Sequence, residues 1–194
     1  MAVMFEDLLN ELYEVFELPE IYVRCSNRNK YIGFLAKLDI TDRLIPMLTK
    51  DKDEQKEMRK SVLEIQEEFK DYPRGIYLPE TIEAMNRPRN KVFFQSLVDV
   101  LQENNVPAND ISIATFIILH EFGHLVEFNM VKDKKSWVLD YTLSQMKLRN
   151  KGYSDQDIRL HKEYRRIPYE VRADRYAVGS MKKLLELGGN VNAK

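Results

Sequence analysis

Residues 111–119 read ISIATFIIL, which is the longest apolar run of the chain and the feature that most limits its fold. Apolar side chains all round two helical turns predict a helix that is buried from every side. Asp110 directly precedes the run and is the expected N-cap of this helix, 111 to about 129. The run is far shorter than the roughly 20 apolar residues that cross a bilayer, so no membrane span is predicted.

Helical periodicity recurs on both sides of this segment, whereas strand signals lie in the first eighty residues. IYVRC (21–25) and YIGFLAKLDI (31–40) flank the turn-like cluster SNRNK and predict a β-hairpin. IYL (76–78) predicts a short strand, and Pro79 favours an edge position for it. The expected fold class is α+β, predominantly helical, with a small N-terminal sheet. Helices are predicted at about 4–15, 51–70, 90–104, 137–149, 154–165 and 168–188.

Length and composition favour one domain spanning 1–194, because no linker-like stretch divides the chain. Thirty basic residues oppose 31 acidic ones, and the net charge of −1 gives no reason to expect nucleic acid or an anionic membrane as a partner. Cys25 is the only cysteine, so an intrachain disulfide is excluded and a reducing, cytoplasmic location is expected. The N-terminal segment carries acids and no basic stretch, unlike a signal peptide.

The apolar run leads directly into HEFGH, which places two of the three histidines of the chain one helical turn apart. In that position His120 and His124 can each give one nitrogen to a single Zn²⁺. Glu121 is offset around the helix, where it can act as general base on a zinc-bound water. The alternative is two core histidines beside an accidental glutamate, but burying these groups without a partner is costly. Gly123 is either tolerated in the helix or marks the close approach of another backbone.

A catalytic zinc needs a third protein ligand and an open fourth position. A histidine six residues after the motif would be residue 130, which is Met130, so the third ligand is His161 or a carboxylate. The last predicted helix has an inward apolar stripe that, extended backwards, contains Glu170 and Asp174. Two core-facing acids are explained if Glu170 binds zinc and Asp174 holds a ligating imidazole. The stripe consists of Ala173, Ala177, Val178, Met181, Leu184 and Leu185.

The alternative for these two acids is a frayed helix end in which both are solvated. In a second version of it, Asp174 pairs with a neighbouring arginine such as Arg172 or Arg175.

The two segments together resemble a known class of enzyme. HEFGH is followed by YEVRADRYAV, whose Glu170 lies 46 residues after His124. The pair resembles the gluzincin zinc peptidases and, more closely, the ImmA/IrrE-type metallopeptidases of phages, mobile elements and bacteria. The similarity covers roughly residues 75–185. The pattern of that family is HExxH and, later, a glutamate followed by A-D/N-x-[FY]-A, which here corresponds to Glu170, Ala173, Asp174, Tyr176 and Ala177.

The resemblance implies a zincin-like domain with its motif-bearing core at about 75–188 and one Zn²⁺ per chain. It implies His120, His124 and Glu170 as ligands, Glu121 as general base and Asp174 as the partner of a ligand histidine. It also implies a protein or peptide substrate, such as a transcriptional regulator. An extended substrate would pair with an edge strand, for which IYL is the candidate.

The expected activity is therefore zinc-dependent hydrolysis of peptide bonds inside a protein substrate. Donors to the oxyanion of such a reaction are sought among His161, Tyr164, Tyr169 and Tyr176. A zinc-binding regulatory or interaction module without proteolytic activity is the first alternative. A purely structural zinc site is the second, but such sites are usually closed, four-coordinate and rich in cysteine.

Overall fold

The computed structural model of the chain is predominantly helical with a small three-stranded sheet, so the α+β prediction is confirmed. The structure describes residues 2–28, 32–36, 38–68, 74–85, 90–154 and 156–187. The elements follow one another along the chain as α1 (Phe5–Val15), β1 (Val23–Cys25), β2 (Gly33–Leu35), α2 (Thr41–Leu48), α3 (Lys52–Glu68), β3 (Gly75–Leu78), α4 (Ile82–Met85), α5 (Lys91–Glu103), α6 (Asp110–Met130), α7 (Lys134–Arg149), α8 (Ile158–Tyr164) and α9 (Pro168–Glu186).

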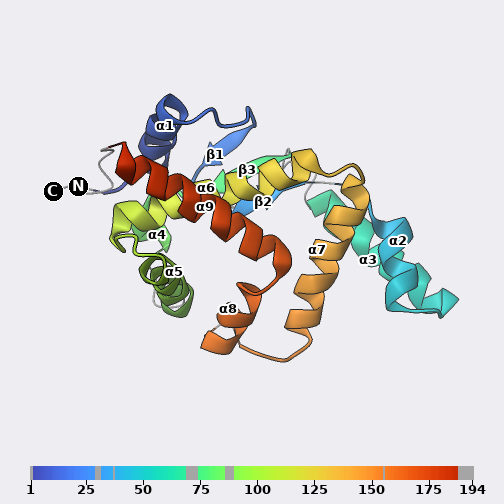
Figure 1. Cartoon of the computed structure of the whole chain (residues 1–194). Coiled ribbons are helices and arrows are strands. Elements are labelled where there is room, and N and C mark those ends of the chain that lie inside the picture. The colour runs from blue at the N-terminus through green and yellow to red at the C-terminus, as the bar shows by residue number, and fades with distance from the viewer. Residues whose placement is uncertain are drawn as a thin grey trace.

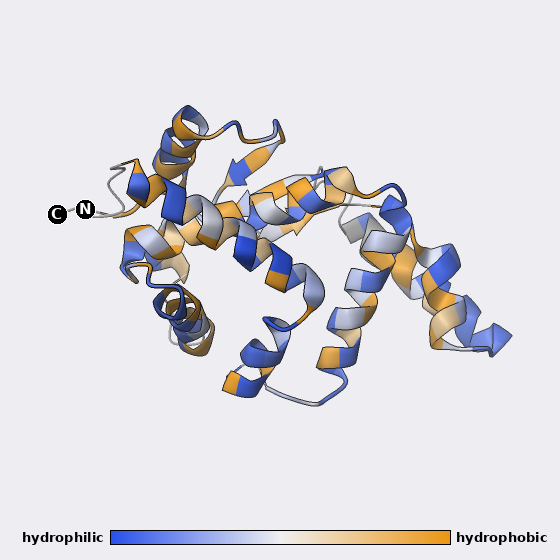
Figure 2. Cartoon of the chain, viewed as in Figure 1, coloured by the Kyte–Doolittle hydropathy of each residue, from blue (hydrophilic) through white to orange (hydrophobic). Residues whose placement is uncertain are grey.

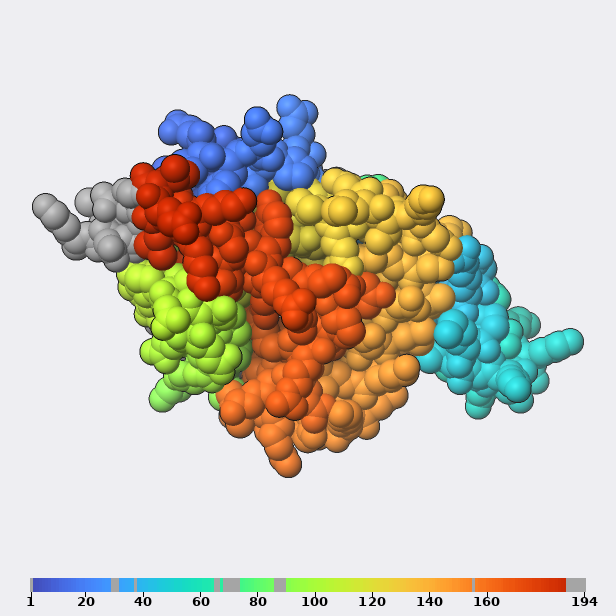
Figure 3. Space-filling view, viewed as in Figure 1, coloured from blue at the N-terminus to red at the C-terminus, as the bar shows by residue number. Residues whose placement is uncertain are grey.

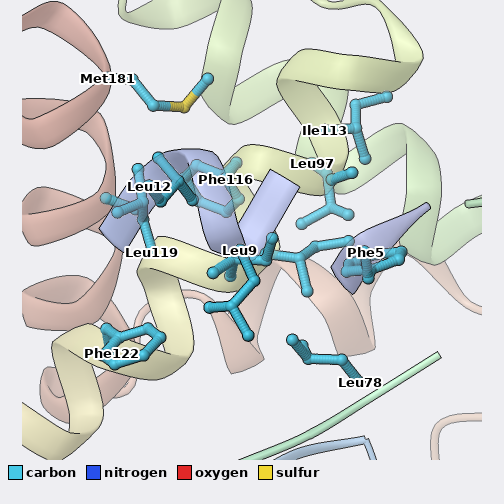
Figure 4. Close-up of a cluster of buried hydrophobic side chains, with 14 of the residues drawn as sticks. Phe5, Leu9, Leu12, Leu78, Leu97, Ile113, Phe116, Leu119, Phe122 and Met181 are labelled. Carbon is cyan, nitrogen blue, oxygen red and sulfur yellow. The ribbon is translucent and has the colours of Figure 1, made fainter. Parts of the chain in front are cut away.

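Helix α6 lies at the centre of the molecule, packed against α9, α1, α5, β2 and β3 (Figure 1). Its side chains are buried from all sides over the first turns, as the apolar run predicts. Figure 4 shows Phe116, Leu119 and Phe122 of α6 within the buried apolar cluster, to which Leu12 and Leu97 also belong. The central helix is thus the element around which the other helices are arranged.

Helix α6 does have the length and hydropathy of a membrane-spanning segment, alone among the described helices. However, 78% of its most apolar 18-residue window is buried inside the protein, which is the placement of a core helix. The N-cap is Asn109, whose side chain accepts a hydrogen bond from the Ser112 N–H, and not the predicted Asp110. Asp110 instead occupies the first helical turn, where its charge suits the helix dipole.

The sheet has the order β1-β3-β2, which corrects two expectations. The predicted β-hairpin is wrong, because β1 and β2 do not pair with each other: β1 runs parallel to β3 and β2 antiparallel to it. IYL is not an edge strand, since it forms part of β3, the central strand, and all four β3 residues are buried. Pro79 follows the last strand residue, so its missing N–H removes no ladder hydrogen bond. The edge strand beside α6 is β2.

Two helices were not predicted. Helix α2 contains Pro46, and a proline is normally evidence against a helix interior. Helix α4 is a single turn, which is too short for helical periodicity to indicate it. Together, α2 and α3 project from one end of the molecule beside α7 (Figures 1 and 3). Arg43 of α2 reaches Asp133, the N-cap of α7, with a nitrogen–oxygen distance of 3.1 Å, and this contact joins the projection to the body.

The other predicted helices are confirmed with small shifts at their ends. Asp157 is the N-cap of α8, which therefore begins at Ile158 and not near residue 154. Helix α9 ends at Glu186. The predicted end of this helix at residue 188 lies outside the described residues, as do residues 29–30 of the predicted turn and 69–70 of a predicted helix end. The part of α9 facing the viewer in Figure 2 carries many hydrophilic residues, whereas its opposite side packs on α6.

Candidate metal centre

Helices α6 and α9 bring three potential metal ligands together. Nε2 of His120 lies 3.1 Å from Nε2 of His124 and 3.2 Å from Oε2 of Glu170. The ligand atoms of all three residues lie within 4.8 Å of one another, and all three side chains are buried. Glu170 is fully buried although it carries a carboxylate. The chain therefore contains a buried group that could bind a metal ion.

The hydrogen bonding of this group fits a cation. Oε2 of Glu170 has no hydrogen-bond partner within the described part of the chain and lies 3.2 Å from Nε2 of His120, while Oε1 lies 3.6 Å from Nε2 of His124. A buried carboxylate oxygen without a hydrogen-bond partner is costly in a protein interior. Two imidazoles and a carboxylate are ligand types that suit a divalent transition metal. A cation among them would remove the cost.

Asp174 fixes the orientation of His120. Its Oδ1 atom accepts hydrogen bonds from Nδ1 of His120 at 2.8 Å and from the Arg165 guanidinium at 2.7 Å. With Nδ1 engaged, Nε2 of His120 is directed at the ligand group. The arginine that pairs with Asp174 is Arg165, which the sequence analysis did not single out, while Arg172 pairs with Glu127. The solvated alternative for the two acids is therefore wrong.

The electrostatics of the metal-free group place its positive charge on His120. Burial lowers the pKa of His120, but the hydrogen bond to Asp174 and the negative charge of the nearby Glu170 carboxylate outweigh this and raise it overall. Burial and the neighbouring His120 charge lower the pKa of His124. For Glu170, burial raises the pKa, and the two histidines outweigh burial and lower it overall. An incoming cation would replace the proton on Nε2 of His120, the ring nitrogen that faces Glu170.

Glu121 is not part of the ligand group. Its Oε2 atom accepts a hydrogen bond of 2.7 Å from the backbone N–H of Phe34 in β2. Gly33 has a φ of +132°, and a Cβ at this position would lie 3.3 Å from the same carboxylate oxygen, so both backbone and space favour glycine. Burial raises the pKa of Glu121. The edge strand thus holds the carboxylate that sits between the two ligand histidines in the sequence.

Gly123 marks the closest approach of α6 and α9. A Cβ built on it would lie 2.9 Å from Cα and 3.1 Å from the carbonyl oxygen of Ala173, and 3.2 Å from Cβ of Tyr176. Of the two interpretations offered for this glycine, close backbone approach is the one that holds, and the approaching backbone is that of α9. The helix contact sets how near Glu170 lies to the two histidines.

Two aromatic residues of α7 complete the surroundings, and the sequence analysis missed their role. Tyr141 donates its hydroxyl to Oε1 of Glu170 at 2.5 Å and lies 3.3 Å from the hydroxyl of Tyr164. The rings of Tyr141 and Trp137 lie 5.5 and 6.5 Å from the His124 ring. Their spacing of four residues on one helix face was the available signal, but nothing in it pointed to Glu170.

Two of the four proposed oxyanion donors lie on α8. Tyr164 borders a cavity that His120 and Glu121 also line, so it is brought to the ligand group. The His161 ring lies 5.9 Å from the Phe93 ring, and the third member of the group of potential ligands is Glu170 and not His161. Burial raises the pKa of Tyr164, which keeps its hydroxyl protonated and able to donate.

The other two proposed donors lie on α9. The ring of Tyr169 packs at 5.2 Å on Trp137 and at 5.4 Å on Tyr141, so it supports the α7 aromatics. Tyr176 packs at the α6–α9 contact beside Gly123. Neither residue lines the cavity that His120 and Glu121 border.

That cavity has a volume of about 210 Å³ and opens beside the ligand group. Its wall is mostly apolar and is contributed chiefly by α5 and α6. It is lined by Ile32, Met85, Asn90, Phe93, Leu97, Phe116, Ile117, His120, Glu121, Tyr164 and Arg165.

Comparison with protein-family models, with curated proteins and with solved structures gave no match. Function must therefore be inferred from the residues of the site.

Proposed function

We propose that this protein is a zinc-dependent endopeptidase of the gluzincin type, resembling the ImmA/IrrE metallopeptidases, with one zincin-like domain over 1–194. The observation that carries the proposal is the buried group of His120, His124 and Glu170, with Glu121 next to it and an adjoining cavity. Three protein ligands leave a fourth position for water and substrate, which is the arrangement of catalytic zinc sites. The expected metal is one Zn²⁺ per chain.

Bound zinc would lower the pKa of a coordinated water towards about 7 and polarise the scissile carbonyl. Glu121 then serves as general base and passes the proton to the leaving amine. The Phe34 N–H holds this carboxylate through Oε2, which leaves Oε1 to receive the proton. Burial raises the pKa of Glu121, and a raised carboxyl pKa suits a group that must accept and return a proton.

Substrate binding is assigned to the cavity beside His120 and Glu121. Its apolar wall suits an aliphatic or aromatic side chain, and its volume of about 210 Å³ has room for one. Tyr164 borders the same cavity and is the best placed of the four proposed residues to donate to the developing oxyanion. The resemblance to the ImmA/IrrE type suggests a transcriptional regulator as the substrate, in the cytoplasm.

A zinc-binding regulatory module without proteolytic activity is the competing function. Both functions would use the same group of potential ligands. Proteolysis is favoured because Glu121 lines a cavity with room for a substrate side chain. A structural zinc site fits less well, since the ligand group contains three residues and no thiolate. Cys25, the only cysteine, lies on β1 and is not among the ligands.

Two measurements test the proposal. Elemental analysis should find about one zinc per wild-type chain and a clear loss in Glu170→Ala. Cleavage of an unfolded protein mixture by zinc-loaded wild type, against equally loaded Glu121→Gln, should show activity in the wild type alone. A wild-type protein that takes up no zinc refutes the metal site. Zinc-loaded protein that cleaves no more than Glu121→Gln leaves the binding module as the function.

A further inference from the structure

The two carboxylate oxygens of Glu170 have different surroundings. Oε1 accepts the Tyr141 hydroxyl at 2.5 Å, while Oε2 has no hydrogen-bond partner in the described part of the chain. Oε2 is also the oxygen nearer to His120, at 3.2 Å from its Nε2 atom. A buried carboxylate with one engaged and one unengaged oxygen offers only the second one freely to a cation.

We propose that Tyr141 is a positioning residue that occupies Oε1 of Glu170 and makes this glutamate a one-oxygen metal ligand through Oε2. The inference deepens the proposed function, but it rests only on metal binding and not on proteolysis. Groups that hydrogen-bond a ligand from behind set its orientation, and removing them typically weakens metal binding about 10–100-fold.

The phenol of Tyr141 is held rigidly enough for this task. Its ring packs against those of Trp137, at 5.5 Å, and Tyr169, at 5.4 Å, and it lies 5.5 Å from the His124 ring. The Tyr164 hydroxyl lies 3.3 Å from its own. These contacts hold the Tyr141 ring, and with it the position of the hydroxyl oxygen. The hydrogen bond from this hydroxyl therefore also fixes the orientation of the Glu170 carboxylate.

This arrangement separates the roles of the two neighbouring tyrosines. Tyr141 does not line the cavity beside Glu121, and its hydroxyl is already engaged by Glu170, so it is not placed to bind substrate. Tyr164 does line that cavity. Helix α7 therefore contributes to the metal site through a ligand that belongs to α9, without supplying a ligand itself.

Tyr141→Phe removes the hydroxyl while keeping the ring and its packing. The zinc affinity of this variant, measured by competition with a chromophoric chelator, is expected to fall about 10–100-fold below that of the wild type. Tyr153→Phe is the matched control, because the Tyr153 hydroxyl donates to another carboxylate, that of Glu163, which is not among the ligands. The control should bind zinc as the wild type does.

A second measurement tests the inference on the wild type itself, and so does not depend on whether the variant folds. In zinc-loaded minus metal-free infrared difference spectra, a carboxylate bound through one oxygen shows a wide separation between its two stretching bands. This separation should be wide in the wild type and narrower in Tyr141→Phe, where both oxygens become available.

The outcomes separate the two proposals. Equal zinc affinity in Tyr141→Phe and wild type, or a narrow band separation in the wild type, overturns the role of Tyr141 and leaves the metal site intact. Weakened binding with a wide wild-type separation supports the role of Tyr141, whether or not the protein cleaves any substrate. A wild type that binds no zinc overturns this inference together with the proposed function.

Discussion

Replacing Gly123 by alanine tests whether the closeness of α6 and α9 builds the metal site. The added Cβ would lie 2.9 Å from a backbone Cα and 3.1 Å from a backbone oxygen of Ala173, well inside the 3.5–4.0 Å optimum for carbon contacts. Because the obstructing atoms are backbone, the helices must move apart. Overpacking of this kind costs about 1–3 kcal/mol, and we expect the upper part of that range. Alanine regains about 1 kcal/mol of helix propensity.

The net loss of stability in Gly123→Ala is therefore about 2 kcal/mol. For a chain of this length it should lower Tm by roughly 4–8 °C. The movement also separates Glu170 from His120 and His124, so the zinc affinity should fall as well. Both quantities are measured on the same preparation, by thermal unfolding of the metal-free protein and by chelator competition.

Gly179→Ala supplies the matched control on α9. A Cβ at this exposed position meets nothing within 4 Å, so only the helix propensity changes. A gain of about 1 kcal/mol and a Tm higher by roughly 2–4 °C are expected, with unchanged zinc affinity. If Gly123→Ala were stabilised as much as Gly179→Ala, the reasoning from the helix contact would be refuted.

Further predictions concern His120, its partner Asp174 and the start of α6. Asp174→Asn should weaken zinc binding about 10–100-fold in chelator competition, because the acceptor that orients His120 loses its charge. The pKa of His120 is raised to about 9, so zinc binding at pH 7 should release the proton of this imidazole. Calorimetry in buffers of different ionisation enthalpy measures the released proton. The zinc affinity should accordingly increase with pH up to about pH 9. The metal-free protein should correspondingly lose the stabilisation from this raised pKa as the pH increases from about 6.5 through 9. Asn109→Ala should cost about 0.5–2 kcal/mol in denaturant unfolding, because the Ser112 N–H loses its acceptor.

The parts of the fold that the sequence predicts correctly depend on contacts between near neighbours. The central helix follows from the apolar run at 111–119, and the facing histidines follow from a spacing of four. Glu170 was recognisable because an acid continued an apolar stripe. In each case the evidence lies within one helix, where residue spacing translates directly into position.

The errors concern partners that are distant in the chain. Pairing of β1 and β2 with β3 depends on segments some fifty residues away, and the local signal of Pro79 indicated the wrong position for β3. Tyr141 reaches Glu170 only because α7, α8 and α9 fold back on one another, and Arg165 reaches Asp174 for the same reason. Periodicity within a single helix contains no information on such contacts.

The hydrogen bond between Phe34 and Glu121 also bears on how the protein avoids self-association. A strand at the border of a sheet offers unpaired N–H groups to which a strand of another chain can attach. At β2 one such N–H is covered by a carboxylate from α6. Loss of this carboxylate would expose the edge next to the ring of Phe34, a combination that favours aggregation. The residue proposed as the base of the reaction therefore also covers a backbone N–H at the outer edge of β2.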